Sequence, residues 1–154
     1  MLEIDTLRFL YDGFPMDYSL AAPTGSCVAL IGPSGGGKTT LLHLVAGFNQ
    51  AVSGRLYFNG RDLLALPPED RPCTMLFQEH NLFPHLTCTQ NIGLGLNPGL
   101  KLTSEDHRAI QEALTRVGLA GFGDRLPRQL SGGQRQRVSL ARSLVRRRPL
   151  LLLD

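Results

Sequence analysis

The residues of this chain best suited to chemistry lie in the segment GPSGGGKT, residues 32–39. Its spacing is G-x-x-x-x-G-K-[ST], and its glycines let the backbone curl so that several N–H groups point inward. Inward N–H groups, one ammonium group and one hydroxyl together suit the phosphate chain of a nucleotide. We expect Lys38 to contact the β- and γ-phosphates and Thr39 to hold Mg²⁺.

The segments on both sides give this motif the setting that a phosphate loop needs. The preceding run GSCVALIG, residues 25–32, is short, apolar and bounded by glycines, so we expect a buried strand. The following run TTLLHLVAGF, residues 39–48, has helical spacing and closes at Gly47. The N-terminus of such a helix adds a partial positive charge. An ordinary glycine-rich turn is the alternative interpretation, which this context disfavours.

A second glycine-rich segment, LSGGQRQR, begins at Leu130. Ser131 is an expected N-cap, and Gln134, three residues later, completes a capping box. Gly132 and Gly133 then lie in the first turn, where each weakens the helix by up to about 1 kcal/mol. Their presence indicates that something approaches the backbone closely, so we expect a second anion site. The alternative is a plain capped helix.

Composition and charge narrow the class of protein. The chain has 154 residues, of which 42% are hydrophobic, so we expect one folded domain, neither disordered nor membrane-spanning. The N-terminal segment carries acid where a signal peptide would carry base, which is typical of a cytoplasmic protein. Cys27, Cys73 and Cys88 have no metal or redox spacing, and we expect reduced, buried thiols.

The net charge is +3, and seven arginines lie between Arg128 and Arg148. Nucleic-acid binding is one interpretation of this cluster. No aromatic residue lies among these arginines to stack on a base. We therefore favour a solvated helix face, and we expect no nucleic-acid partner.

Hydrophobic spacing predicts the remaining elements. Strands are expected over residues 2–11, 53–60 and 72–79, and a helix over 103–118. A second helix begins at Ser131 and is stopped by Pro149, and residues 150–153 then suit a strand buried on both faces. The expected buried stripes are Ile110, Ala113, Leu114 and Val117 in the first helix, and Val138, Ala141, Leu144 and Val145 in the second.

GPSGGGKT, the glutamine in MLFQE, LSGGQ and LLLLD occur in this order, and over its whole length the chain resembles the ATP-binding subunit of an ABC transporter. The resemblance implies an α/β fold, with a P-loop NTPase core, an N-terminal antiparallel β part and an inserted α-helical subdomain. It assigns residues 1–80 and 149–154 to the nucleotide-binding core. Residues 81–148 would form the mainly helical subdomain with the LSGGQ signature.

The resemblance also implies a role for each motif. Tyr11 resembles the aromatic residue that stacks on adenine, although a plain position on a strand surface is the alternative. Gln78 resembles the glutamine that helps to bind Mg²⁺ and touches the permease, and Asp154 resembles the Walker B aspartate that holds Mg²⁺ through water. The signature segment, Leu130–Gln134, would face the γ-phosphate of ATP held by a second, identical subunit. The expected ATP-binding residues are Tyr11, Gly32, Pro33, Ser34, Gly35, Gly36, Gly37, Lys38, Thr39, Thr40 and Gln78; the signature residues are Leu130, Ser131, Gly132, Gly133 and Gln134; the Mg²⁺ ligands are Thr39, Gln78 and Asp154.

Within the family, QNIGLGLNPGLKL and the start FLYDGFPMDYSL look most like the ATPase of thiamine importers. The resemblance implies that ATP-driven dimerisation and hydrolysis energise import through a separate permease, with a periplasmic binding protein acting indirectly. The subunit would lie peripherally on the cytoplasmic face of the bacterial inner membrane. An importer of a polyamine, iron or an anion, a nonhydrolytic ATP-binding fragment, and a soluble ABC ATPase working on nucleic acid are the alternatives.

The family continues after the Walker B aspartate with a catalytic glutamate, whereas this chain ends at Asp154. We therefore expect a fragment of a longer subunit, with an incomplete sheet and no complete set of catalytic residues. Such a chain would bind ATP but would not hydrolyse it alone.

Overall fold

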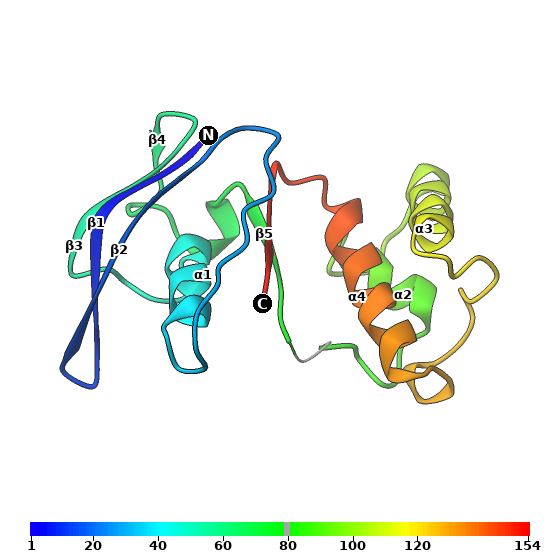
Figure 1. Cartoon of the computed structure of the whole chain (residues 1–154). Coiled ribbons are helices and arrows are strands. Elements are labelled where there is room, and N and C mark those ends of the chain that lie inside the picture. The colour runs from blue at the N-terminus through cyan, green and yellow to red at the C-terminus, as the bar shows by residue number, and fades with distance from the viewer. Residues whose placement is uncertain (79–80) are drawn as a thin grey trace. The chain divides into compact units, whose positions relative to one another are not determined.

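The computed structural model describes residues 1–78 and 81–154, and the chain divides into two compact units, Met1–Cys73 and Thr74–Asp154. The first unit holds a four-stranded antiparallel sheet, in the order β2-β1-β3-β4, and helix α1 (Figure 1). Its elements are β1 (Leu2–Tyr11), β2 (Phe14–Ala22), α1 (Lys38–Ala46), β3 (Ser53–Phe58), β4 (Arg61–Asp62) and the 3-10 helix η1 (Pro68–Asp70).

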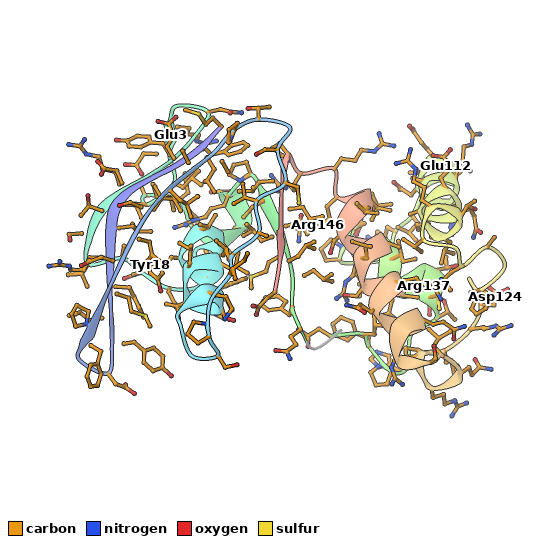
Figure 2. The ribbon with its side chains drawn as sticks, in the orientation of Figure 1. Glu3, Tyr18, Glu112, Asp124, Arg137 and Arg146 are labelled. Carbon is orange, nitrogen blue, oxygen red and sulfur yellow. The ribbon has the colours of Figure 1, made fainter. Side chains whose placement is uncertain are left out.

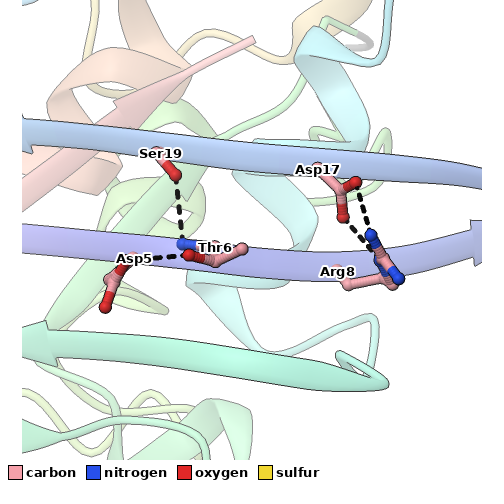
Figure 3. A network of polar contacts seen from close by, with 5 residues as sticks. All are labelled: Asp5, Thr6, Arg8, Asp17 and Ser19. Atoms are coloured by element: carbon pink, nitrogen blue, oxygen red, sulfur yellow. Dashed lines mark hydrogen bonds and ion pairs between the residues drawn. The ribbon is translucent and has the colours of Figure 1, made fainter.

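A bulge in β1 explains why apolar and polar residues alternate imperfectly along this strand. Ile4 to Leu7 spans three residues, whereas the paired part of β2 advances by two. Thr6 lies in the bulge with a φ of 48°, and its N–H donates to the Ser19 hydroxyl at 3.0 Å (Figure 3). A shift of one residue exchanges the two faces of a strand. The bulge therefore brings Leu7, and not its neighbours, onto the buried face.

Beyond the bulge, residues that lie opposite each other on β1 and β2 share a face. Leu7 and Phe9 lie opposite Tyr18 and Met16, and Leu7 is fully buried. Met16 and Tyr18 therefore lie on the core-facing side of the hairpin. Alternation along β1 places Tyr11 on that side as well.

The other face of the hairpin is polar. Arg8 donates to both carboxylate oxygens of Asp17, at 2.7 and 2.8 Å, and the Thr6 hydroxyl donates to Asp5 at 2.8 Å (Figure 3). The hydrogen bond from Arg8 lowers the pKa of Asp17. These side chains are exposed, so the pair adds little to stability. It marks the solvent-facing side.

The second unit is a helical bundle followed by a strand. Helices α2, α3 and α4 bury a common apolar core, and β6 pairs with β5, running in the same direction in Figure 1. The core residues are Cys88, Ile92, Ile110, Ala113, Leu114, Leu119, Leu130, Val138, Ala141 and Val145. The elements are β5 (Cys73–Leu76), α2 (Cys88–Gly93), α3 (Ser104–Arg116), the 3-10 helix η2 (Pro127–Gln129), α4 (Gly132–Val145) and β6 (Leu150–Leu153).

Both long helices begin where the sequence predicts. Thr103 caps α3 in a capping box with Asp106, and Ser131 caps α4 in one with Gln134. The predicted stripes are buried or half-buried with one exception, because Leu144 is 39% exposed. With about 100° between successive residues, Leu144 lies well to one side of the line through Ala141 and its buried neighbours. The assignment of Leu144 to the core was wrong.

Two predicted buried strands differ from expectation. Residues 25–32 form no strand, and Ile31 is 95% exposed, because no segment in residues 1–78 or 81–154 pairs with this run. Strand β6 forms as predicted, but Leu151 and Leu153 are exposed while Leu152 is buried, since only one of its faces is covered. Cys27, in the first run, is exposed and not buried as expected.

The remaining expectations fit more closely. The predicted strands 2–11 and 53–60 appear as β1 and β3, and the strand predicted for 72–79 appears as β5, with residue 79 outside the described residues. Residues 81–148 lie within the second unit. The assignment of residues 1–80 and 149–154 to a nucleotide-binding core and of residues 81–148 to a helical subdomain stays a prediction. Within the described ranges, no helix has the length and apolar character needed to cross a bilayer.

Candidate nucleotide-binding site

The predicted phosphate loop, residues 32–39, leads into α1 without a capping side chain. Gly37 is the N-cap, with a φ of 80°, and has no side chain that could accept from the first N–H groups of the helix. The loop turns through a hydrogen bond from the Gly36 N–H to the Pro33 carbonyl at 3.1 Å. The N–H groups at such a helix start suit an anion.

Lys38 folds back over its own loop. Its Nζ donates to the carbonyl oxygens of Gly32 at 2.9 Å and Pro33 at 2.7 Å. The ammonium group is thus held against the backbone of the loop. Hydrogen bonds between two charged groups are stronger than those to neutral carbonyls, so phosphate oxygens can replace these acceptors.

An open cavity of ≈ 460 Å³ lies beside the loop and is large enough for a small ligand. The structure brings Tyr11, from the end of β1, to the same cavity as Lys38 and Thr39 of α1. The aromatic ring and the loop were predicted to bind opposite ends of one nucleotide. The lining residues are Tyr11, Met16, Gly35, Gly37, Lys38, Thr39, Thr40, His43 and Asn49.

Three residues of this lining were missed by the sequence interpretation. His43 follows Thr39 by four residues, a spacing that shares a helix face and could have revealed it. Met16 lies on a strand that was not predicted, and only the register of the hairpin shows its side. Asn49 follows the glycine that ends α1, and no local pattern points to it. Gly32, Pro33 and Gly36 shape the loop as described above, and Ser34 is exposed.

The signature segment, Leu130–Gln134, forms the start of α4. The Gln134 N–H donates to the Ser131 hydroxyl oxygen at 3.3 Å, and the Ser131 N–H donates to the Gln134 side chain at 2.9 Å. Leu130 is buried and anchors the segment in the helical core. At Gly132 and Gly133 an added Cβ would meet no other atom within 4 Å. The fold of this chain therefore does not itself require glycine there.

Two further predicted residues follow the paired strands β5 and β6. Gln78 lies two residues beyond β5, and Asp154 directly follows β6. The Asp154 N–H donates to the Leu76 carbonyl at 3.0 Å, so both residues lie at the same end of this strand pair. Both side chains are exposed. This placement suits residues that contact a ligand at the carboxyl ends of parallel strands.

The oxygen donors predicted for Mg²⁺ are a hydroxyl at Thr39, an amide at Gln78 and a carboxylate at Asp154. Mg²⁺ prefers such oxygen ligands and keeps several waters, so these side chains fit the ion chemically. Thr39 lines the cavity of the first unit. Among the described residues, no group of three or more His, Cys, Asp and Glu side chains could hold a metal.

Asn91 holds the segment of residues 83–87, which leads into α2. Its Nδ2 donates to the carbonyls of Phe83, Leu86 and Thr87 at 2.9–3.1 Å, and its Oδ1 accepts from the Phe83 N–H at 2.8 Å. Asn91 is fully buried. A buried amide with these four hydrogen bonds holds the loop in one conformation, whereas Phe83 is 47% exposed. The sequence interpretation gave Asn91 no role.

The phosphate loop, the cavity beside it and the signature segment suit the class of ATP-binding protein that the sequence predicts. Comparison with known families agrees with this class. Residues 16–154 match the family profile described as ABC transporter. The chain belongs to the ABC transporter family, and its fold is that of the family's ATP-binding cassette, as predicted.

Particular relatives are similar over the whole chain. The chain is 55% identical over 154 residues to a thiamine import ATP-binding protein, ThiQ, of Yersinia pseudotuberculosis, and 54% identical to ThiQ of Chelativorans sp. and of Vibrio cholerae. These matches cover 100% of this chain but only 65%, 63% and 65% of the relatives' lengths.

Solved structures show the same likeness. A dimeric post-hydrolysis state of the ATP-binding cassette MJ0796, bound to ADP and Pi, aligns with a TM-score of 0.84 at 28% identity. A second dimeric structure of MJ0796, described as a bacterial ABC transporter cassette, aligns with a TM-score of 0.83. Both matches cover 100% of this chain and 73% of the other.

Proposed function

We propose that this chain is the nucleotide-binding part of a subunit that binds and hydrolyses ATP to drive the import of thiamine. The observation that carries the proposal is the phosphate loop at the uncapped start of α1, with Lys38 inside the loop and Tyr11 lining the same cavity. The relatives at 54–55% identity are thiamine import ATP-binding proteins, which supports thiamine as the substrate.

Each predicted ATP-binding residue and Mg²⁺ ligand has a role in this proposal. Tyr11 stacks on the adenine, the Lys38 ammonium group contacts the β- and γ-phosphates, and Thr40 lies beside the phosphate chain. Thr39, Gln78 and Asp154 hold Mg²⁺ directly or through water, and the ion neutralises part of the phosphate charge. The remaining loop residues, Gly32, Pro33, Ser34, Gly35, Gly36 and Gly37, surround the phosphates with backbone groups.

The signature segment serves a second copy of the subunit. Exposed Gly132 and Gly133 leave the start of α4 open to close approach, which supports contact with the γ-phosphate of ATP bound to the partner. The dimeric structures of the similar cassette support this arrangement. Gly133→Asp should leave ATP binding by one subunit intact and block ATP-driven dimerisation, because a carboxylate would repel that phosphate. Normal dimerisation of the variant on a sizing column would contradict this role.

We place the permease contact on residues 78–86, of which 79 and 80 lie outside the described residues. The exposed Phe83 and the loop fixed by Asn91 support this placement. A periplasmic binding protein acts only indirectly, through the permease. The subunit then lies peripherally on the cytoplasmic face of the inner membrane.

The central test is the affinity of the chain for ATP, measured by calorimetry. Lys38→Ala should abolish measurable binding of Mg-ATP, because the charge at the β- and γ-phosphates is lost. Lys101→Ala is the matched control, since Lys101 is the other lysine of the chain and lies outside the loop. Equal affinity of the Lys38→Ala and wild-type proteins would contradict the proposal.

The substrate needs a separate test in membrane vesicles that contain the subunit, its permease and its binding protein. ATP inside the vesicles should drive uptake of labelled thiamine, and uptake should stop with Lys38→Ala. Uptake of a polyamine, iron or an anion in place of thiamine would keep the ATP-binding role and reject the substrate.

A further inference from the structure

One hydroxyl group outside the sequence motif contacts the phosphate loop. Tyr18 of β2 donates its hydroxyl proton to the Gly37 carbonyl at 3.0 Å, and Figure 2 shows Tyr18 between the sheet and α1. The sulfur of Met16 lies 3.3 Å from the Tyr18 hydroxyl oxygen, but a carbonyl is a stronger acceptor than a thioether. The loop is thus tied to β2 at Gly37, the N-cap of α1.

Gly37 and Tyr18 fit each other sterically. A Cβ at position 37 would lie 2.5 Å from the Tyr18 hydroxyl oxygen and 3.1 Å from the Met16 methyl carbon. The φ of 80° at Gly37 also disfavours any other residue. Burial raises the pKa of Tyr18, against a smaller opposite effect of Thr40, so the hydroxyl keeps its proton at neutral pH. The contact is therefore part of how the loop is built.

This contact fixes the orientation of one peptide group. The Gly37 carbonyl accepts from Tyr18 and also from the Leu41 N–H, at 2.9 Å. The peptide bond from Gly37 to Lys38 is trans, so the Lys38 N–H points away from the side on which the carbonyl is held. An N–H at the start of a helix is a donor that anions use. Holding the carbonyl therefore orients a donor of the phosphate loop.

We propose that Tyr18 is a positioning residue of the phosphate loop, whose hydroxyl holds the Gly37–Lys38 peptide so that the Lys38 N–H faces the bound phosphate chain. The inference rests on the proposed function, since it takes a nucleotide as the ligand. Tyr18 acts through the peptide group and contacts neither the phosphates nor the base. Its contribution should therefore depend on the phosphates of the ligand and not on the nucleoside.

The test compares ligands that occupy different ends of the cavity. Tyr18→Phe keeps the ring and removes only the hydroxyl. Calorimetric affinity for Mg-ATP and for Mg-tripolyphosphate should fall roughly five- to tenfold, as expected for one lost hydrogen bond, while the affinity for adenosine should not change. Tyr57→Phe is the control, because it removes the hydroxyl of a half-buried tyrosine on β3, outside the cavity lining, and should change none of the three affinities.

Three other outcomes would overturn the inference in distinguishable ways. Unchanged affinity of Tyr18→Phe for tripolyphosphate would reject the positioning role and leave the proposed function standing. An equal loss for adenosine would show that the variant loosens the whole cavity, which also rejects that role. A wild-type chain that binds neither ATP nor tripolyphosphate would reject the proposed function and the inference together.

Discussion

The two glycine-rich helix starts of this chain are built in different ways. At α1 the N-cap is Gly37, no side chain caps the helix, and a Cβ would collide with Tyr18. At α4 the N-cap is Ser131 in a complete capping box, and a Cβ at Gly133 would meet nothing within 4 Å. Glycine at α1 is required by the chain's own contacts, whereas glycine at α4 is not.

This difference separates two reasons for glycine at a binding site. The loop before α1 is shaped by contacts within its own unit, so its N–H groups are oriented before a ligand arrives. The start of α4 is an ordinary capped helix whose glycines cost helix stability and serve no neighbour in the described structure. Their use must lie with something that approaches from outside, which the proposed function takes to be a second subunit's nucleotide.

The largest expected effect is at Gly37. Gly37→Ala should lower the free energy of unfolding by about 1–3 kcal/mol, from backbone strain and the collision with Tyr18, and should abolish ATP binding. Gly13→Ala is a matched control, because Gly13 has a φ of 83° but open space around it. Urea unfolding measures the loss of stability in both variants. Equal losses at the two positions would show that backbone conformation alone requires glycine at position 37.

The next effect concerns the cap of α4. Ser131→Ala should lower the free energy of unfolding by about 1 kcal/mol, the usual cost of removing an N-cap side chain. Ser34→Ala, in the uncapped loop before α1, should change it by less than about 0.5 kcal/mol. If the two alanine variants lost the same stability, the contrast between the capped and uncapped starts would fail.

A smaller effect of opposite sign is expected at Gly133. Gly133→Ala should raise the free energy of unfolding by about 0.5–1 kcal/mol, because alanine favours the helix and no atom lies in its way. The affinity of a single subunit for ATP should stay the same. Reduced stability of this variant in thermal unfolding would mean that the fold requires glycine here after all.

The smallest effect is a pH dependence that distinguishes the capping boxes of the two long helices, α3 and α4. In α3, hydrogen bonds from Thr103 to Asp106 lower the pKa of this carboxyl, so the ionised form stabilises the helix. The resulting contribution to the free energy of unfolding is present above the pKa of a free aspartate, about 3.9. It is lost as the pH falls through the lower pKa that Asp106 has in the folded state.

Urea midpoints of wild type and Asp106→Asn should therefore differ at pH 6 and converge at a pH below the lowered pKa of Asp106. Gln134 takes the same position in the box of α4 and has no ionisable group, so Gln134→Ala should differ from wild type by the same amount at both pH values. A gap between wild type and Asp106→Asn that persists at low pH would contradict the assignment.

The sequence predicted those features that depend on neighbours in the chain. The phosphate loop, the capping box of α4 and the start of each long helix arise from residues within a few positions of one another, such as Ser131 and Gln134. The contact of Tyr18 with Gly37, in contrast, joins two segments that folding brings together, and no local pattern indicates it.

The same reason accounts for the wrong assignments. The run at residues 25–32 has the composition of a strand, but a strand exists only when another pairs with it. Arg71 was given no role, yet it is buried and donates to the carbonyls of Leu44 and Val45 in the last turn of α1. Charged residues at such positions are recognised only once the fold shows what they contact.

The bulge at Thr6 lets β1 carry one residue more than the strand with which it pairs, without a change of face. Leu20 and Tyr18 of β2 are two residues apart, and Thr6 is the extra residue between their partners Ile4 and Leu7. Deleting Thr6 would therefore remove the bulge and leave Tyr11 on the same side as Met16 and Tyr18. A deletion between Leu7 and Tyr11, in contrast, would turn the ring of Tyr11 to the opposite face from Leu7. The hairpin tip at Asp12–Gly13 is exposed, as loop tips that tolerate changes in length are. Relatives that share this site should therefore differ in length at the hairpin tip or at position 6, and not between Leu7 and Tyr11.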